Sequence, residues 1–170
     1  MKLASLESIV RALAQREVRY LIVGGLAVAA HGVGRATFDI DVVLKMQPEN
    51  VLKALSALQS LGYRPTAPVD AKDLADEAVR ETWIREKRMI VLQLQSDLHP
   101  ETTIDLFVDE PFDFDHEYAN ALVGDLLPGV TMRFPQAATL IRMKEATGRA
   151  KDAEDARLLR KLGGGSNAGA

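Results

Sequence analysis

Two aspartates stand two positions apart in a short apolar segment, residues 38–44, that is rich in β-branched residues. Residues at i and i+2 of a β-strand point to the same face, so Asp39 and Asp41 project together while Ile40 turns to the core. Two carboxylates this close repel each other, and a divalent cation between them is the simplest way to stabilise the pair. The spacing therefore predicts a Mg²⁺ site.

A third acid, Asp105, lies in the middle of a second apolar segment, residues 103–108. Ile104 and Leu106 share one face of the strand expected there, and Asp105 occupies the other. Beside the first strand, the three carboxylates would hold two Mg²⁺ ions ~4 Å apart, with Mn²⁺ as a substitute. One ion would activate an attacking oxygen and the other would hold a triphosphate, which is the chemistry of phosphoryl or nucleotidyl transfer.

A glycine pair, Gly24 and Gly25, interrupts an apolar stretch ahead of the two aspartates. Glycine lets the backbone approach a phosphate closely, and the start of the helix expected at residues 26–31 offers unpaired N–H groups. The pair fits neither GxGxxG nor GxxxxGK[ST], so on its own it is a weak signal. Its value as a phosphate-binding candidate comes from the acids that follow it.

Four polar residues are supporting candidates. Arg35 and Thr37 lead into the acidic strand, and Arg35 has two open interpretations: it binds a phosphate, or it neutralises the aspartates. Lys144 and Lys151 belong to a basic C-terminal region and would approach a triphosphate; the alternative is an ordinary solvated helix face.

Other chemically suggestive residues have simpler interpretations. His31 is expected to pack or cap. The acidic residues 109–117 lack the regular spacing that would aim their oxygens at one point, which favours a solvated loop. Asp152 and Asp155 are expected to cap or pair within the last helix, although a buried Asp152 would orient Lys151.

Hydrophobic periodicity and turn residues predict the elements that must position these side chains. Helices are expected over the first fifteen or so residues and over residues 48–61, 70–87, 135–147 and 150–162, with strands at residues 20–23, 38–44, 89–94, 103–108 and 130–134. We expect a single domain over residues 1–162, followed by a flexible glycine-rich tail, residues 163–170.

Composition limits the classes of function. The net charge of -3 argues against a broad nucleic-acid-binding surface, because such surfaces neutralise many phosphates with Lys and Arg. The chain has no cysteine, which suits a reducing cytoplasm. Its longest apolar stretch, residues 20–30, is shorter than the ~20 residues that cross a bilayer. We therefore expect a cytoplasmic protein with no membrane partner.

The combined pattern resembles a known superfamily. The run Val23-Gly24-Gly25-Leu26-Ala27 followed by Asp39-Ile40-Asp41 resembles the signature of the DNA polymerase beta-type nucleotidyltransferases, and Asp105 matches their third carboxylate. Together with His31-Gly32, Arg35 and Thr37, it resembles the minimal nucleotidyltransferases related to the AbiEii abortive-infection toxins. Residues 140–144 and 149–152 strengthen this resemblance, which covers roughly residues 18–162.

The resemblance implies an α/β (α+β) fold, with a mixed sheet flanked by helices and further helices at the C-terminus. It implies Mg²⁺-dependent transfer of a nucleotide from a nucleoside triphosphate such as ATP to a hydroxyl, with tRNA or protein as the favoured acceptor. A role as a toxin would imply an antitoxin partner. Many members carry Gly-Ser where this chain has Gly24-Gly25, so one phosphate contact is missing.

The resemblance assigns a role to each candidate residue. Asp39, Asp41 and Asp105 would be the catalytic metal ligands, and Gly24, Gly25, Arg35, Thr37, Lys144 and Lys151 would bind the nucleotide phosphates. The alternative is a non-catalytic nucleotide-binding antitoxin or regulatory module of the same fold. The presence of all three acids counts against that alternative.

Overall fold

The structure is a computed structural model that describes residues 1–127 and 129–165. Five strands form a mixed sheet in the order β1-β2-β5-β4-β3. β2 and β5 run parallel to each other, and the other neighbouring strands run antiparallel. The strands are β1 (Tyr20–Ile22), β2 (Asp39–Leu44), β3 (Arg64–Pro65), β4 (Val91–Gln95) and β5 (Thr103–Phe107).

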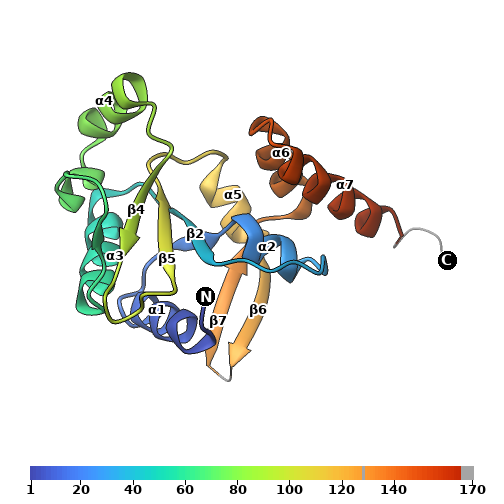
Figure 1. The fold of residues 1–170 in the computed structure, drawn as a ribbon, viewed down its shortest axis with the longest axis horizontal. Helices are drawn as coiled ribbons and strands as arrows, with labels where there is room; N and C mark the ends of the chain where they lie inside the picture. Colours follow the sequence, from blue (N-terminus) through green and yellow to red (C-terminus); the bar gives the residue numbers. More distant parts are fainter. Residues whose placement is uncertain (128, 166–170) are drawn as a thin grey trace.

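Helices surround this sheet, and a separate antiparallel hairpin of β6 (Leu122–Leu127) and β7 (Val130–Phe134) lies against β1. In Figure 1, α6 and α7 lie at the opposite end of the molecule from α1 and α3. The helices are α1 (Leu3–Gln15), α2 (Gly24–Ala30), α3 (Pro48–Ser60), the 3-10 helix η1 (Ala71–Ala75), α4 (Glu77–Lys87), α5 (Phe114–Ala119), α6 (Ala137–Ala146) and α7 (Ala150–Gly165). The predicted α/β fold with a mixed sheet and C-terminal helices is confirmed.

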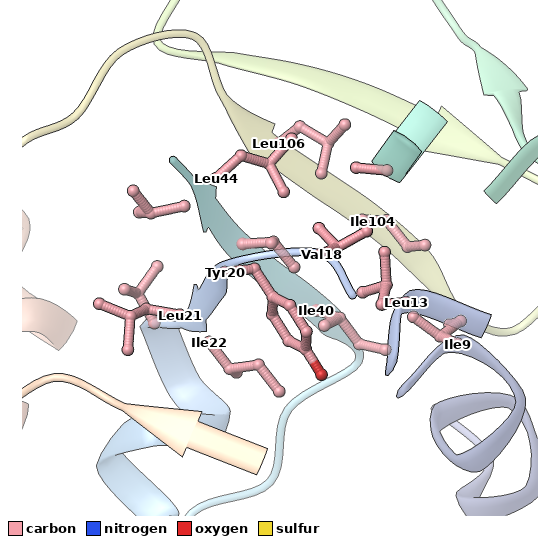
Figure 2. Packing of buried hydrophobic residues seen from close by; sticks show 14 of the residues in the cluster. Ile9, Leu13, Val18, Tyr20, Leu21, Ile22, Ile40, Leu44, Ile104 and Leu106 are labelled. Atoms are coloured by element: carbon pink, nitrogen blue, oxygen red, sulfur yellow. The ribbon is translucent and has the colours of Figure 1, made fainter. Parts of the chain in front are cut away.

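The core fills the face of the sheet that α1 and α3 cover. The buried residues of α1 recur at helical spacing, so one side of the helix is apolar, and Ile9 and Leu13 lie on it. Figure 2 shows these two side chains beside Ile40 of β2 and Ile104 of β5, and all four are at most 1% exposed. Because side chains alternate along a strand, burying this face turns the aspartates between them to the opposite face.

Two of the expected elements differ in the structure. Residues 70–87 form two helices, because Asp70 caps η1 and the Asp76 side chain accepts hydrogen bonds from the backbone N–H groups of Ala78 and Val79, which starts α4. At the C-terminus, α7 continues through Gly165, beyond the expected helix end at Leu162. The rest of the expected tail, residues 166–170, lies outside the described residues.

The expectation of a solvated acidic loop at residues 109–117 is correct for residues 109–113, where Asp109 and Asp113 are exposed outside any helix or strand, and wrong from Phe114 onward. Asp113 caps α5, which starts at Phe114. Glu117 of this helix is 4% exposed, and its carboxylate accepts hydrogen bonds from the Gln136 backbone N–H at 3.0 Å and the Thr139 hydroxyl at 2.5 Å. This buried acid fixes the start of α6, which carries Lys144.

Candidate active site

The three candidate acids meet on one face of the two central strands. Asp41 of β2 lies directly opposite Asp105 of β5, and Asp39 lies opposite Thr103. Since β2 and β5 are parallel and in register, all three carboxylates leave the sheet on the side away from α1 and α3. Asp39 is exposed, while Asp41 and Asp105 are half-buried.

Neutral donors hold two of these carboxylates. The Thr103 hydroxyl donates to Asp39 Oδ1 at 2.9 Å, and the Gln93 side-chain amide donates to Asp105 Oδ1 at 3.1 Å. Both donors occupy positions directly opposite their acids in neighbouring strands. Cross-strand pairing therefore orients Asp39 and Asp105.

The surroundings of Asp41 disfavour its ionised form. Burial, followed by the charge of Asp105, raises the pKa of Asp41 from its ordinary value of 3.8 to about 6; the Lys144 ammonium lowers it and Asp39 raises it. Burial also raises the pKa of Asp105, against the hydrogen bond from Gln93. The cluster holds more negative charge than its surroundings neutralise, so it favours a bound cation.

The glycine pair packs directly against Asp41. Gly24 has φ of +64°, and a Cβ there would lie 1.8 Å from Asp41 Oδ2. A Cβ at Gly25 would lie 2.9 Å from the Thr37 hydroxyl oxygen and 3.1 Å from Arg35 Nε. Both positions need glycine, because a side chain would enter space that these groups already fill.

A cleft of about 800 Å³ opens over the acids. Its walls include the segment between α2 and β2, the start of β4, and the facing sides of α6 and α7. Every residue that the sequence predicts for the site lines it: Gly24, Gly25, Arg35, Thr37, Asp39, Asp41, Asp105, Lys144 and Lys151. His31, which was expected to pack or cap, is not among the residues that line the cleft. Its Nε2 forms a hydrogen bond with the Pro135 carbonyl oxygen at 2.8 Å.

Two basic residues of the cleft, Arg35 and Lys144, have acidic partners that the sequence did not indicate. Arg35 pairs with Asp155 of α7, and with neither Asp39 nor Asp41. The Lys144 ammonium lies 2.6 Å from Asp152 Oδ1 and 3.1 Å from Asp155 Oδ2. Lys151 is exposed at the rim.

Sequence reasoning missed the roles of Asp152 and Asp155. They were expected to cap or pair within α7, yet they are 6% and 5% exposed and pair with groups from α6 and from the α2–β2 segment. Their spacing of three places them on one side of α7, and the basic residue Lys144 on the preceding helix was the only available hint. Gln93 was also missed, because its contact with Asp105 exists only when β4 lies beside β5, and the sequence does not reveal this strand order.

The donor set suits Mg²⁺, because it consists of carboxylate oxygens with excess negative charge. Within residues 1–127 and 129–165, no three His, Cys, Asp or Glu side chains are arranged as a finished metal site. In this arrangement Asp39 accepts a hydrogen bond from Thr103 and Asp105 accepts one from Gln93, so each carboxylate is held by a neutral donor. The residues fit the ion, and the carboxylates would rotate away from these donors to bind it.

Comparisons with known proteins address the fold. No protein-family model and no curated protein matches the sequence. The chain is similar to the crystal structure of ANT(2'')-Ia in complex with adenylyl-2''-tobramycin, with a TM-score of 0.60 and 17% identity over 97% of this chain and 91% of that chain. It is also similar to the solution structure of ANT(2'')-Ia, described as an antibiotic-resistance factor with substrate-regulated conformation dynamics.

That second similarity has a TM-score of 0.59 and 17% identity, and covers 92% of this chain and 81% of that chain. At this identity the likeness establishes the fold, which is nucleotidyltransferase-like. In the described part of the chain, no helix is both long and apolar enough to cross a membrane.

Proposed function

We propose that this nucleotidyltransferase-like chain is an active Mg²⁺-dependent nucleotidyltransferase, which moves a nucleoside monophosphate from a nucleoside triphosphate to a hydroxyl acceptor. One observation carries the proposal. Asp41 lies opposite Asp105 on adjacent parallel strands, with Asp39 on the same face, at the floor of a cleft whose far wall carries Lys144 and Lys151. This arrangement pairs a cation site with an anion site, as a metal-bound triphosphate requires.

Each part of the cleft has a role in this reaction. Bound Mg²⁺ would be held by Asp39, Asp41 and Asp105 and would neutralise charge on the phosphates and the attacking oxygen. Gly24 and Gly25 line the cleft as bare backbone that a phosphate can approach closely, and Lys144 and Lys151 would attract the phosphates. The acceptor oxygen bonds to the α-phosphorus, the bond to pyrophosphate breaks, and Asp105 receives the hydroxyl proton.

The charge of the cleft favours RNA as the acceptor. The acids that line it are Asp39, Asp41 and Asp105, which the proposed metal site uses, and Asp152, which pairs with Lys144. The exposed rim carries Arg142, Arg149 and Lys151. A polycation such as tobramycin would meet like charge at this rim, whereas an RNA phosphate would be attracted to it. Such a local contact is compatible with the net charge of -3.

The test is transfer of label from each α-³²P-labelled nucleoside triphosphate, with Mg²⁺, into a cell extract separated into RNA and protein, and into tobramycin. Asp41→Asn is the active-site variant, and Asp97→Asn is the control, because Asp97 is an exposed acid paired with Arg64 outside the cleft. Label in RNA with wild type and control, but not with Asp41→Asn, supports the proposal. Label found only in protein or only in tobramycin would show that this molecule, and not RNA, is the acceptor. No label in any fraction would reject the proposed transferase activity.

The alternative is a non-catalytic nucleotide-binding antitoxin or regulatory module of the same fold. Mg²⁺-dependent nucleotide binding without transfer to any fraction would favour it. The geometry argues against it, because a module that only binds nucleotide has no need of Asp105 beside Asp41, where its charge helps to raise the pKa of Asp41 to about 6.

The sequence resemblance favours one biological role for the proposed transferase, that of an AbiEii-like toxin. Transfer to tRNA would stop translation in the cytoplasm, and an antitoxin would be needed to restrain it. Expression of the wild-type protein should then arrest growth, and Asp41→Asn should abolish the arrest. Normal growth with wild-type protein present and active in lysates would exclude the toxin role while leaving the transferase intact.

A further inference from the structure

A buried ionic cluster joins the C-terminal helix to the phosphate side of the cleft. It consists of Arg35 from the α2–β2 segment, Lys144 from α6, and Asp152 and Asp155 from α7. Their side chains are 14%, 11%, 8% and 8% exposed, in that order. Two positive and two negative groups balance, so the cluster is neutral as a whole.

The two acids hold their partners from different sides. Asp155 pairs with both Arg35 and Lys144, while Asp152 pairs with Lys144 and also accepts a hydrogen bond from the Thr147 hydroxyl at 2.8 Å. Burial alone would raise the pKa of Asp152, but the hydrogen bonds from Lys144 and Thr147 lower it, so this acid stays ionised. Asp152 therefore acts as a fixed anion, and Asp155 lies close to it on the same side of α7.

Arg35 has a donor that the cluster does not use. Its Nε is buried and has no hydrogen-bond partner in the part of the chain that the structure describes. The same atom would lie 3.1 Å from a Cβ at Gly25, so it stands beside the glycine pair. Buried donors are nearly always satisfied, and Arg35 lines the cleft, so a ligand bound in the cleft is a candidate source of the acceptor.

We propose that the Arg35 Nε–H binds a phosphate oxygen of the nucleoside triphosphate, and that Asp155 is a positioning residue that holds the guanidinium in the orientation for this contact. Asp155 holds Lys144 in the same way and does not itself touch the substrate. The inference rests on the proposed function and adds to it that α7, although distant in sequence from the acids, builds the triphosphate site.

The experiment compares KM for the nucleoside triphosphate with kcat, using the full chain with Mg²⁺. Asp155→Asn and Arg35→Lys should each raise KM by about 10- to 100-fold, which is the loss of one charge-assisted hydrogen bond, and should leave kcat within about twofold. Arg35→Lys retains a cation for Asp155 but lacks Nε, so it tests the phosphate contact without removing the buried pair. Asp155→Glu should recover part of the affinity.

Glu154→Gln is the matched control, because Glu154 is an acid on the neighbouring position of α7 that is half exposed and pairs with Arg157. It should leave KM unchanged. The double variant Arg35→Gln/Asp155→Asn separates positioning from stability. Removing both charges should recover thermal stability lost in Asp155→Asn, whereas KM should stay high because the donor is gone.

An unchanged KM in Arg35→Lys overturns the phosphate contact even if Asp155→Asn fails to fold. Recovery of KM together with stability in the double variant shows a purely structural cluster and also overturns the proposal. In both cases wild-type transfer would continue, so the proposed function would survive. A wild-type protein that neither binds nor transfers any nucleotide would reject both.

Discussion

At the residue scale, the candidate site is organised around a carboxylate that is poorly stabilised without a cation. Asp41 has a raised pKa because it is buried beside Asp105, and Lys144 offsets this only in part. Its folded-state pKa lies above its unfolded value, so the protonated form stabilises the fold. That contribution is present below about pH 4 and is lost as the pH rises through about 6.

We therefore predict that Asp41→Asn, which is neutral at every pH, raises the melting temperature of metal-free protein at pH 7.5. The gain should be about 2 kcal/mol, or several degrees, and should largely disappear at pH 3.5, below the unfolded-state pKa of 3.8. Mg²⁺ should stabilise wild type more than the variant at pH 7.5. Thermal melts in EDTA and in Mg²⁺ at both pH values measure this, and an equal shift of Asp41→Asn at both pH values would contradict it.

Gly24 supports a second prediction at this scale. In Gly24→Ala, the new methyl would overlap the Asp41 carboxylate, so we expect transfer activity to fall at least about 100-fold as that carboxylate is displaced. Gly129→Ala is the matched control: Gly129 has φ of +76°, and apart from its chain neighbours no atom of the described residues lies within 4 Å of its Cβ position. Both variants incur about 1–2 kcal/mol of backbone strain, and only Gly24→Ala should lose activity at equal folded fraction.

The acids themselves were predictable from sequence, because alternation along a strand needs only local information. Asp39, Asp41 and Asp105 each interrupt an apolar run, and the apolar neighbours had to face the core. Gln93 and Asp155 were not predictable in this way. Their partners, Asp105 and Arg35, become neighbours only through the strand order and the packing of α7.

At the element scale, the missed features are short or depend on tertiary contacts. β3 has two residues and α5 has six, which is too few for periodicity to appear. The break before α4 depends on Asp76, whose capping role competes with continuation of the helix predicted from Asp70. Long amphipathic helices such as α1 and α3 were predicted well, because their apolar positions repeat over several turns.

The two acids of α5 should contribute very different amounts to the stability of the fold. Glu117 is buried and accepts two hydrogen bonds from the start of α6, so Glu117→Ala leaves those donors unsatisfied and should destabilise the protein by about 2–3 kcal/mol. Asp115 is exposed and pairs with Arg19 and Lys45, so Asp115→Ala should cost less than about 1 kcal/mol. Urea unfolding of both variants measures the difference, and similar losses would show that the α5–α6 connection contributes little.

At the scale of the whole molecule, the distribution of charge carries information about the acceptor that the fold alone does not. The overall charge is -3, yet Arg142, Arg149 and Lys151 lie on the exposed rim of the cleft. A fold shared at 17% identity does not determine which acceptor approaches that rim, whereas the sign of the rim charge does. Long-range attraction of an anionic acceptor is weakened by salt, so it leaves a measurable signature.

Transfer to RNA should therefore fall steeply with ionic strength, and Arg149→Glu should lower kcat/KM for RNA by about 10-fold at low salt while flattening the salt dependence. Lys161→Glu is the control, because Lys161 is exposed on the same helix as Lys151 but does not line the cleft. It makes a charge change of equal size at a place that an acceptor in the cleft does not reach. Equal effects of the two variants would show that only overall charge matters. A rate independent of salt in the wild type would show that the acceptor is not a polyanion, and the cationic rim would then have to serve the triphosphate alone.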